Sequence, residues 1–415
     1  MASSLPNFAE DPSTAQGELD CLEPSPLVQK VGESTRETRY ARARVPALDG
    51  LRGVAILLVL LWHGLFENDS SSKLVADFLA LGRLSWSGVD LFFVLSGFLI
   101  GGILLDAKDS PRYFATFYLR RAYRILPVYV VAVGLFSLRY LPFHFLRGWV
   151  GAGTDIPFAS YPTFTQNLWM AHLGVFGPLG LAVTWSLAIE EQFYLTIPLV
   201  IRKLNRLQLT YALICIVVGV PVLRTVLLFK LPHGNVADYV LMPCRADALC
   251  LGVLSAILVR HLRTWRALVE KRALLYWATV LPLAGVAWLT YKGYDFDAKA
   301  MVTLGYSFLA LLYTCCLLIV LVEAPLAQRV MCDRRLIQLG GISYCLYLIH
   351  VPLIDASRYA LAMSLRHFGI HLRHSGSLVL FLGALLGIAM SVVVARLSWR
   401  ILEQPMLRRG HAYKY

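Results

Sequence analysis

An arginine and a histidine lie eleven residues apart in one apolar stretch, and they are the first candidates for chemistry. The stretch reads ALDGLRGVAILLVLLWHGLF over positions 47–66, and the two residues are Arg52 and His63. Eleven residues make almost three helical turns, so both side chains point from nearly the same face, roughly 16 Å apart along the axis. Asp49 falls on that face as well. Because ionisable groups in a membrane segment usually face a protein interior, the stretch predicts a spanning helix that presents a cation, an imidazole and a carboxylate to an internal path.

Carboxylates in two other apolar segments also require partners. Asp90 lies near the start of SWSGVDLFFVLSGFLIGG, and we expect the imidazole of His63 to be its partner. The motif TWSLAIEEQFYLTIPL carries the adjacent Glu190 and Glu191, which are about 100° apart around a helix and cannot share a face. A four-residue spacing places on one face of that helix Ser186, Glu190 and Tyr194.

Three arginines cluster in FYLRRAYRILPVY, where Arg120, Arg121 and Arg124 fall within about one helical turn. Guanidinium groups offer bidentate donors to phosphate, so converging side chains can hold an anionic group. The alternative is a positively charged anchor that contacts lipid phosphates at the membrane surface. The local sequence leaves both interpretations open.

Two more segments carry ionisable residues among apolar ones. In MPCRADALCLGVL, Arg245 and Asp247 are two residues apart, so we expect each to pair with another helix rather than with its neighbour. In GGISYCLYLIHVPL, a shared helix face is predicted for Ser343, Tyr347 and His350, which supplies a second intramembrane imidazole. For His350 a structural role and a functional role both remain open.

We expect no metal site in this chain. His367, His371 and His374 have a helical spacing, but no carboxylate lies nearby to complete a site. The eight cysteines form no CxxC motif, and most lie inside apolar segments, where free cysteines behave as small hydrophobic residues.

The elements that must position these residues are transmembrane helices. Of the 415 residues, 57% are hydrophobic and only 16% are charged, whereas a soluble protein of this size carries about a quarter charged residues. The stretch 164–181 is apolar but interrupted by glycine and proline, so we expect it to be interfacial or re-entrant. We predict an all-α polytopic bundle of about ten transmembrane helices, at 48–66, 84–105, 123–140, 184–201, 208–229, 239–259, 273–291, 300–322, 338–357 and 377–399.

The distribution of basic residues orients this bundle. The connections that begin at positions 106, 202, 260 and 323 have about three times the Lys and Arg density of the other connections, which predicts that they are cytoplasmic. Both termini are then cytoplasmic, with Arg52 in the inner half and His63 in the outer half of a plasma or inner membrane. These clusters account for the formal net charge of +13. Because no basic stripe with interleaved aromatic residues occurs, we expect no nucleic-acid partner.

The chain divides into one large domain and two tails. Residues 1–44 are polar, lack a signal-peptide core and predict a disordered cytoplasmic tail. Residues 45–407 form the predicted transmembrane domain, and residues 408–415 form a short cytoplasmic C-terminal tail.

Seven motifs in order resemble one known family. LDGLRGVAILLVLLWH, SGVDLFFVLSGFLI, FYLRRAYRILPVY, WSLAIEEQFYL, RADALCLGVL, ISYCLYLIHVPL and LSWRILEQP are similar to the acyltransferase-3 family of membrane-bound O-acyltransferases. The resemblance runs from about position 47 to about position 407. The family's Arg-x10-His motif falls on Arg52 and His63, and its RxxR motif falls on Arg121 and Arg124. The SLxxEEQFY motif falls on Ser186, Leu187, Glu190, Glu191, Gln192, Phe193 and Tyr194.

The resemblance implies acyl transfer, commonly of acetyl, from a cytoplasmic acyl-CoA to a sugar hydroxyl of an envelope or exported glycan, as in bacterial polysaccharide and lipopolysaccharide O-acetylases. Arg121 and Arg124, with Arg120, would hold the phosphates of coenzyme A, and the thioester arm would pass Arg52. His63 would act as general base, and either Asp90 or Glu190 would fix its tautomer. We expect supporting or substrate-binding roles for Glu191, Ser186, Tyr194, Arg245, Asp247, Tyr347 and His350.

Two alternatives remain open. The acceptor could be a small molecule, such as a macrolide or a lipid-linked sugar. A bundle with buried charges could instead be a proton-coupled transporter, although no internal repeat is visible. Many glycan O-acetylases of the family that this chain resembles carry a C-terminal extracytoplasmic SGNH-type domain, for which the sequence leaves no room. We therefore expect either that a separate extracytoplasmic partner passes the acyl group on or that the acceptor meets the membrane domain directly.

Overall fold

The computed structural model describes residues 45–66, 82–137, 156–322, 324–368 and 376–415. Every regular element in these ranges is a helix, which confirms the predicted all-α class. The predicted N-terminal tail lies outside the described residues.

The helices range from single turns to rods of 25 residues. In the first half of the chain they are α2 (Pro46–Leu61), η2 (Trp62–Phe66), η3 (Arg83–Ser87), α4 (Gly88–Asp106), α5 (Tyr113–Ser137), η5 (Phe158–Ser160), α7 (Gln166–Leu173), α8 (Leu179–Ala182), α9 (Thr184–Lys203) and α10 (Arg206–Lys230). In the second half they are α11 (Gly234–Val240), α12 (Met242–Val259), α13 (Leu262–Glu270), α14 (Arg272–Tyr291), η6 (Met301–Gly305), α15 (Tyr306–Leu321), α16 (Pro325–Met331), α17 (Arg334–Gly341), α18 (Ser343–His367), α19 (Gly376–Ser398), η7 (Trp399–Glu403) and α20 (Gln404–His411).

Seven helical segments of the described chain are long and apolar enough to cross a membrane. An eighth is the pair α17 and α18, which together pass the same test but are bent by 79° where they meet. Helices α5 and α9, with 25 and 20 residues, are also as long as a hydrocarbon core is thick, but they carry the arginine cluster and the paired glutamates. Within the described residues each of the ten predicted spans overlaps a helix, but α5 begins at Tyr113, ten residues before the predicted span, and the span predicted at 338–357 contains the bend between α17 and α18. Seven or eight of them, rather than ten, are apolar enough to count as ordinary spans. The chain is a multi-pass membrane protein.

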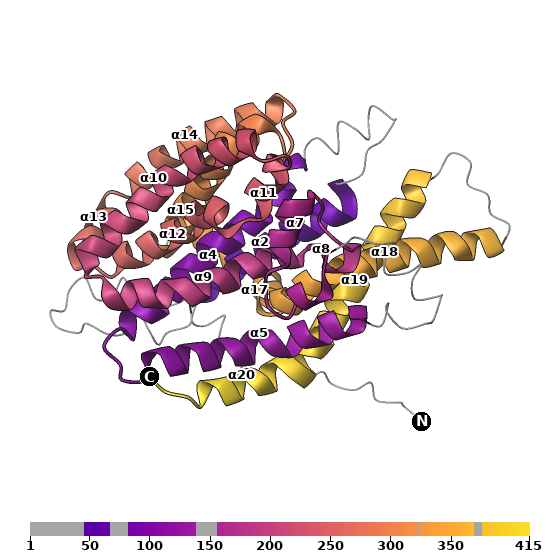
Figure 1. Cartoon of the computed structure of the whole chain (residues 1–415), viewed down its shortest axis with the longest axis horizontal. Helices are drawn as coiled ribbons and strands as arrows, with labels where there is room; N and C mark the ends of the chain where they lie inside the picture. The colour runs from indigo at the N-terminus through magenta and orange to yellow at the C-terminus, as the bar shows by residue number, and fades with distance from the viewer. Residues whose placement is uncertain (1–44, 67–81, 138–155, 323, 369–375) are drawn as a thin grey trace.

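Helices α4 and α12 pack against each other in the middle of the bundle (Figure 1). The contact is close because glycines lie on both sides: a Cβ on Gly97 would overlap the carbonyl of Leu249, and one on Gly252 would overlap the carbonyl of Val94. On one side of this pair α10 packs on α12, and α14 packs on α15. On the other side α2 packs on both α4 and α17, and the last helix, α20, runs along α5 (Figure 1).

The apolar stretch at 164–181 does not cross the membrane as one helix. It forms α7 and α8, of eight and four residues, separated by Gly174 and Gly177 in left-handed backbone conformations. Glycine adopts such conformations without steric penalty, which is why the helical path breaks there. The expected interfacial or re-entrant segment agrees with these short helices.

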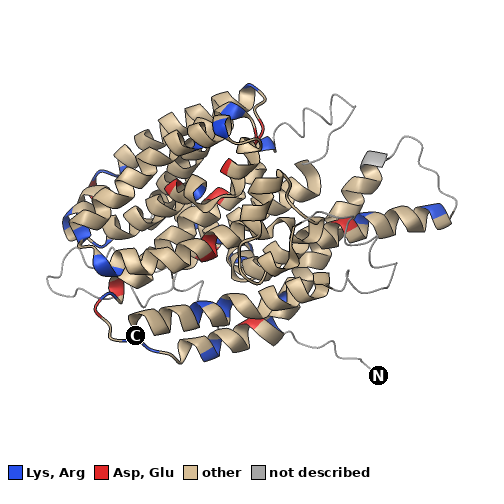
Figure 2. Ribbon diagram, in the orientation of Figure 1, with Lys and Arg blue, Asp and Glu red and all other residues tan. Residues whose placement is uncertain are grey.

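Charged residues lie mostly at the ends of the helices, and long uncharged stretches separate them (Figure 2). A smaller group lies inside the bundle, where Arg224, Asp238, Arg245 and Asp247 are almost completely buried. Buried charges in an apolar interior need partners, so these residues mark the places where helix contacts are specific.

Candidate active site

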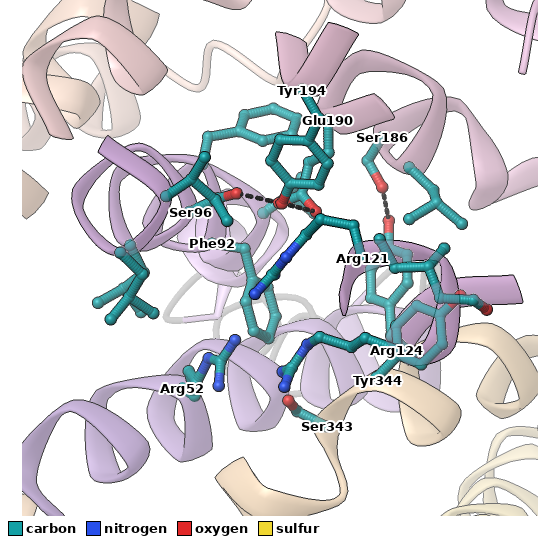
Figure 3. Close-up of a pocket in the computed structure, with 18 of the residues that line it drawn as sticks. Arg52, Phe92, Ser96, Arg121, Arg124, Ser186, Glu190, Tyr194, Ser343 and Tyr344 are labelled. Atoms are coloured by element: carbon teal, nitrogen blue, oxygen red, sulfur yellow. Dashed lines mark hydrogen bonds between the residues drawn. The ribbon is translucent and has the colours of Figure 1, made fainter. Parts of the chain in front are cut away.

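A cavity of about 280 Å³ lies where five helices meet, namely α2, α4, α5, α9 and α18 (Figure 3). One part of its wall is apolar and consists mainly of α4 residues between Val89 and Ile103. The polar side chains of the wall are Arg52, Ser96, Arg121, Arg124, Ser186, Glu190, Tyr194, Ser343, Tyr344 and Tyr347. Five sequence motifs that are far apart in the chain therefore meet at one site.

Three guanidinium groups give this cavity its charge. Arg52 comes from α2, and Arg121 and Arg124 come from successive turns of α5; all three point toward the same space in Figure 3. Glu190 is the one carboxylate among the described residues that line the cavity, although Asp49 lies 3.8 Å from the Arg52 guanidinium. The three guanidinium groups repel one another, and one carboxylate does not neutralise them. An anionic ligand that binds between them is therefore stabilised.

A chain of hydroxyl groups lies against the carboxylate. The Tyr194 hydroxyl donates to Glu190 Oε2 at 3.1 Å, and the Ser96 hydroxyl lies 2.5 Å from the Tyr194 oxygen. Because the Tyr194 proton is used toward Glu190, Ser96 is the donor in the second bond. A shared helix face was predicted for Ser186, Glu190 and Tyr194, and all three line the cavity from α9.

Tyr347 closes one end of the cavity. Its hydroxyl lies 2.6 Å from the Ser186 hydroxyl and 3.1 Å from the Val183 carbonyl oxygen, and its ring packs edge-on against Phe92. Ser343 lies one turn earlier on α18 and lines the same cavity. The third residue of that helix face, His350, is completely buried and is not among the described residues that form the cavity wall.

The two intramembrane histidines contact each other. His350 Nε2 lies 3.2 Å from His63 Nδ1, and the two rings are edge-to-face with centroids 4.8 Å apart. His63 lies in η2, a π-helical turn at the end of α2. Turns of this kind are rare and often occur at functional sites, because the extra residue changes the direction of the side chains.

Asp90 does not pair with His63, so that expectation is wrong. Its carboxylate binds Arg245 of α12 at 2.5 Å, and the Arg245 guanidinium also lies 4.0 Å from the centre of the Tyr306 ring. Asp247 binds Arg224 of α10 at 2.9 Å. The prediction that Arg245 and Asp247 pair with other helices is confirmed. Within the described chain, Glu190 also makes no hydrogen bond to His63; its partner is Tyr194.

Arg120 is directed away from the cavity, contrary to the expectation that it joins the donor site. Its Nε and Nη2 atoms donate to the Tyr413 carbonyl oxygen at 2.9 and 2.6 Å, and its guanidinium lies 5.0 Å from the Tyr415 ring centre. Glu191 lies on the other side of Arg121, in the wall of a second cavity of about 220 Å³ between α5 and α9. Both cavities are lined by Arg121 and Tyr194.

Arg224, which its sequence context alone did not single out, donates to Asp247 and to the Ser307 hydroxyl in the interior. The signal was present, since Arg224 is a lone arginine in a long apolar segment. Among the residues that the structure describes, no group of three His, Cys, Asp or Glu side chains is arranged to hold a metal ion. His371 and His374 lie outside that part of the chain.

An acyltransferase domain model matches residues 45–399, nearly the whole described chain. The chain belongs to the acyltransferase-3 family. Relatives include the peptidoglycan O-acetyltransferase OatA of Listeria monocytogenes, 27% identical over 395 residues that cover 90% of this chain and 58% of that protein. A putative O-acetyltransferase of Staphylococcus aureus is 25% identical over 400 residues, covering 90% of this chain and 59% of its own length.

The putative peptidoglycan O-acetyltransferase YrhL of Bacillus subtilis is 27% identical over 399 residues, covering 91% of this chain and 56% of that protein. The chain therefore spans under 60% of the length of these relatives. No solved structure was found to match it. The family match covers every motif that lines the cavity, from α2 to α18.

Proposed function

We propose that this chain is a membrane O-acyltransferase that moves an acetyl group from acetyl-CoA to a hydroxyl of an envelope or exported glycan. The observation that carries the proposal is the convergence of Arg52, Arg121 and Arg124 on one cavity in a chain of this family. Phosphates are the anions that guanidinium groups bind best, and coenzyme A carries several of them.

The dimensions of the site support a donor that enters by its acyl end. A cavity of about 280 Å³ is at the lower limit for small-molecule sites, so it accommodates only part of the donor, namely phosphate groups beside the arginines and the adjoining arm. Arg52 and His63 are separated by roughly 16 Å of helix. The arm of coenzyme A separates its thioester from its phosphates, so the arginines can hold the phosphate end while the thioester reaches toward His63. Arg52 then holds the donor rather than touching the reacting carbon.

In the proposed reaction the acceptor oxygen attacks the thioester carbonyl carbon, and His63 takes the hydroxyl proton. The carbon–sulfur bond breaks, and the coenzyme A sulfur leaves and is protonated. Tyr347 lines the cavity and its ring centre lies 5.8 Å from that of His350, so we place the route of the thioester toward His63 along this side chain. We place the donor side in the cytoplasm and the acceptor side outside a plasma or inner membrane, with both termini cytoplasmic.

The names of two relatives state that their acceptor is peptidoglycan, and we propose that this chain acts on a glycan of that class. Acylation of a small molecule such as a macrolide or a lipid-linked sugar is the alternative within the same chemistry. A separate extracytoplasmic protein that passes the acetyl group onward is compatible with either acceptor.

The direct test is acetyl-CoA turnover by the purified full chain in lipid nanodiscs. Free thiol release is measured with soluble peptidoglycan fragments, with a macrolide, and with no acceptor, and the products are weighed by mass spectrometry. The proposal predicts thiol release together with an acetyl mass on the glycan fragments. Acetylation of the macrolide alone would favour the small-molecule alternative, and acceptor uptake into vesicles without any acetylation would favour a transporter.

Substituting Arg121 or Arg124 by leucine is expected to weaken acetyl-CoA binding by about 10- to 100-fold, because a hydrogen bond to a charged group contributes about 1.5–3 kcal/mol. Arg120→Leu is the matched control, since that side chain binds the C-terminal segment and not the cavity. The measurement is the dissociation constant of acetyl-CoA by calorimetry. Unchanged affinity in the Arg121 and Arg124 variants would mean that the cluster acts only as a membrane anchor, and an equal loss in Arg120→Leu would mean that the effect is not specific to the cavity.

A further inference from the structure

The hydrogen bonds around the two histidines determine which ring nitrogens carry protons. His350 Nδ1 lies 2.7 Å from the Tyr347 carbonyl oxygen, which can only accept, so Nδ1 of His350 carries the proton. In the neutral ring His350 Nε2 is then an acceptor. That atom lies 3.2 Å from His63 Nδ1, which also lies 3.0 Å from the Val59 carbonyl oxygen.

Both neighbours of His63 Nδ1 are therefore acceptors, and a single arrangement of protons satisfies them. His63 carries its proton on Nδ1 and shares it between His350 Nε2 and the Val59 carbonyl. The second nitrogen, His63 Nε2, then has a free lone pair. This is the nitrogen that a general base needs in order to accept a proton.

We propose that His350 is a positioning residue that holds His63 in the Nδ1–H tautomer, which leaves Nε2 as the base for the acceptor hydroxyl. The role of His63 as a base rests on the proposed function, whereas its tautomer follows from the hydrogen bonds around it. In other acyl-transfer sites a carboxylate orients the basic imidazole. In this chain a neutral imidazole, held by its own backbone bond, does so from a helix 287 residues further along the sequence.

The surroundings of His63 keep the ring in place. Arg358 of α18 donates to the carbonyl oxygens of His63 and Gly64, at 3.3 and 2.7 Å, and so ties η2 to the helix that carries His350. Asp355 lies 3.6 Å from the other side of the Arg358 guanidinium. Arg358 therefore gives η2 and α18 a second contact in addition to the histidine pair, and this contact fixes the distance between the two imidazoles.

The kinetic test compares two substitutions at position 350. His350→Phe removes one of the two acceptors of the His63 Nδ1 proton and is expected to lower kcat by about 10²-fold, because the Val59 carbonyl alone holds the tautomer less firmly. His350→Gln keeps a carbonyl acceptor and is expected to retain kcat within about tenfold of the native value. In both variants KM for acetyl-CoA should stay within about twofold, since His350 does not line the donor cavity.

Ile354→Ala is the matched structural control. Ile354 is buried one turn further along α18, where its backbone lies against Gly387 of α19, so truncating its side chain disturbs the packing of the same helix at a position away from the imidazoles. It should lower thermal stability and leave kcat per folded molecule unchanged. Native kcat in a folded His350→Phe variant, or an equal loss of kcat in Ile354→Ala, would overturn the proposal.

Nitrogen NMR of the native protein labelled with ¹⁵N-histidine tests the tautomer without any activity. The His63 signal, assigned by its loss in His63→Gln, should show a protonated Nδ1 and a bare Nε2, and His350→Phe should change that pattern. A protonated Nε2 in the native protein would overturn the inference even if the enzyme is active. The expected tautomer in a protein without acyl-transfer activity would preserve the geometry and contradict only the proposed function.

Discussion

Replacing His63 by glutamine is expected to reduce acetyl transfer to a small residual rate, with a loss of about 10²- to 10⁴-fold in kcat. The substitution removes the group that accepts the hydroxyl proton in the proposed reaction, and general-base catalysis contributes about 10²- to 10⁴-fold. Glutamine keeps a hydrogen-bonding side chain beside His350, so the helix contact is preserved. The measurement is thiol release from acetyl-CoA together with the acetyl mass on the acceptor.

Binding of acetyl-CoA separates a catalytic loss from a folding defect. His63 is not among the described residues that line the donor cavity, so His63→Gln should bind acetyl-CoA with native affinity. Near-native turnover in this variant would exclude His63 as the general base. Loss of donor binding along with turnover would instead show that the variant disturbs the bundle.

The second large effect is expected on the free energy of unfolding of the bundle. Arg245→Leu is expected to destabilise the protein by about 3–5 kcal/mol, because it leaves the Asp90 carboxylate buried without its charge partner. The two side chains are 1% and 2% exposed, so water cannot replace the lost partner. Thermal unfolding of the purified protein measures the effect as a lowered Tm. Replacing both residues, by Asp90→Asn with Arg245→Leu, should recover part of the loss since no unpaired charge remains.

Arg260→Leu is the matched control for that experiment. Arg260 binds Asp106 between the same two helices, at 2.7 Å, but these side chains are 19% and 25% exposed. Solvent screens a more exposed pair, so the expected loss is about 1 kcal/mol or less. Equal destabilisation by Arg260→Leu and Arg245→Leu would show that the two pairs are equivalent and that burial is not the cause.

Local spacing was sufficient to predict much of the site. The cluster at Arg121 and Arg124 and the four-residue spacing of Ser186 to Tyr194 follow from the helical repeat alone. The repeat does not extend to His63, because that residue lies in the π-helical turn η2, and of the pair only Arg52 lines the cavity. The same repeat places Arg245 and Asp247 on different faces of their helix, so each was predicted to pair with a residue of another helix. These statements hold for any stable helix because they compare residues along one axis.

Only the tertiary structure decided which side chains meet. Asp90 pairs with Arg245 and not with His63, His63 pairs with His350, and Arg120 binds the C-terminal segment while its neighbour Arg121 faces the cavity. The physical reason is that a partner depends on how two helices cross and rotate against each other, which close glycine contacts and packed side chains determine. The sequence by itself therefore determined the all-α class, the family motifs and the residues that share a helix face, whereas the packing of the bundle decided their partners.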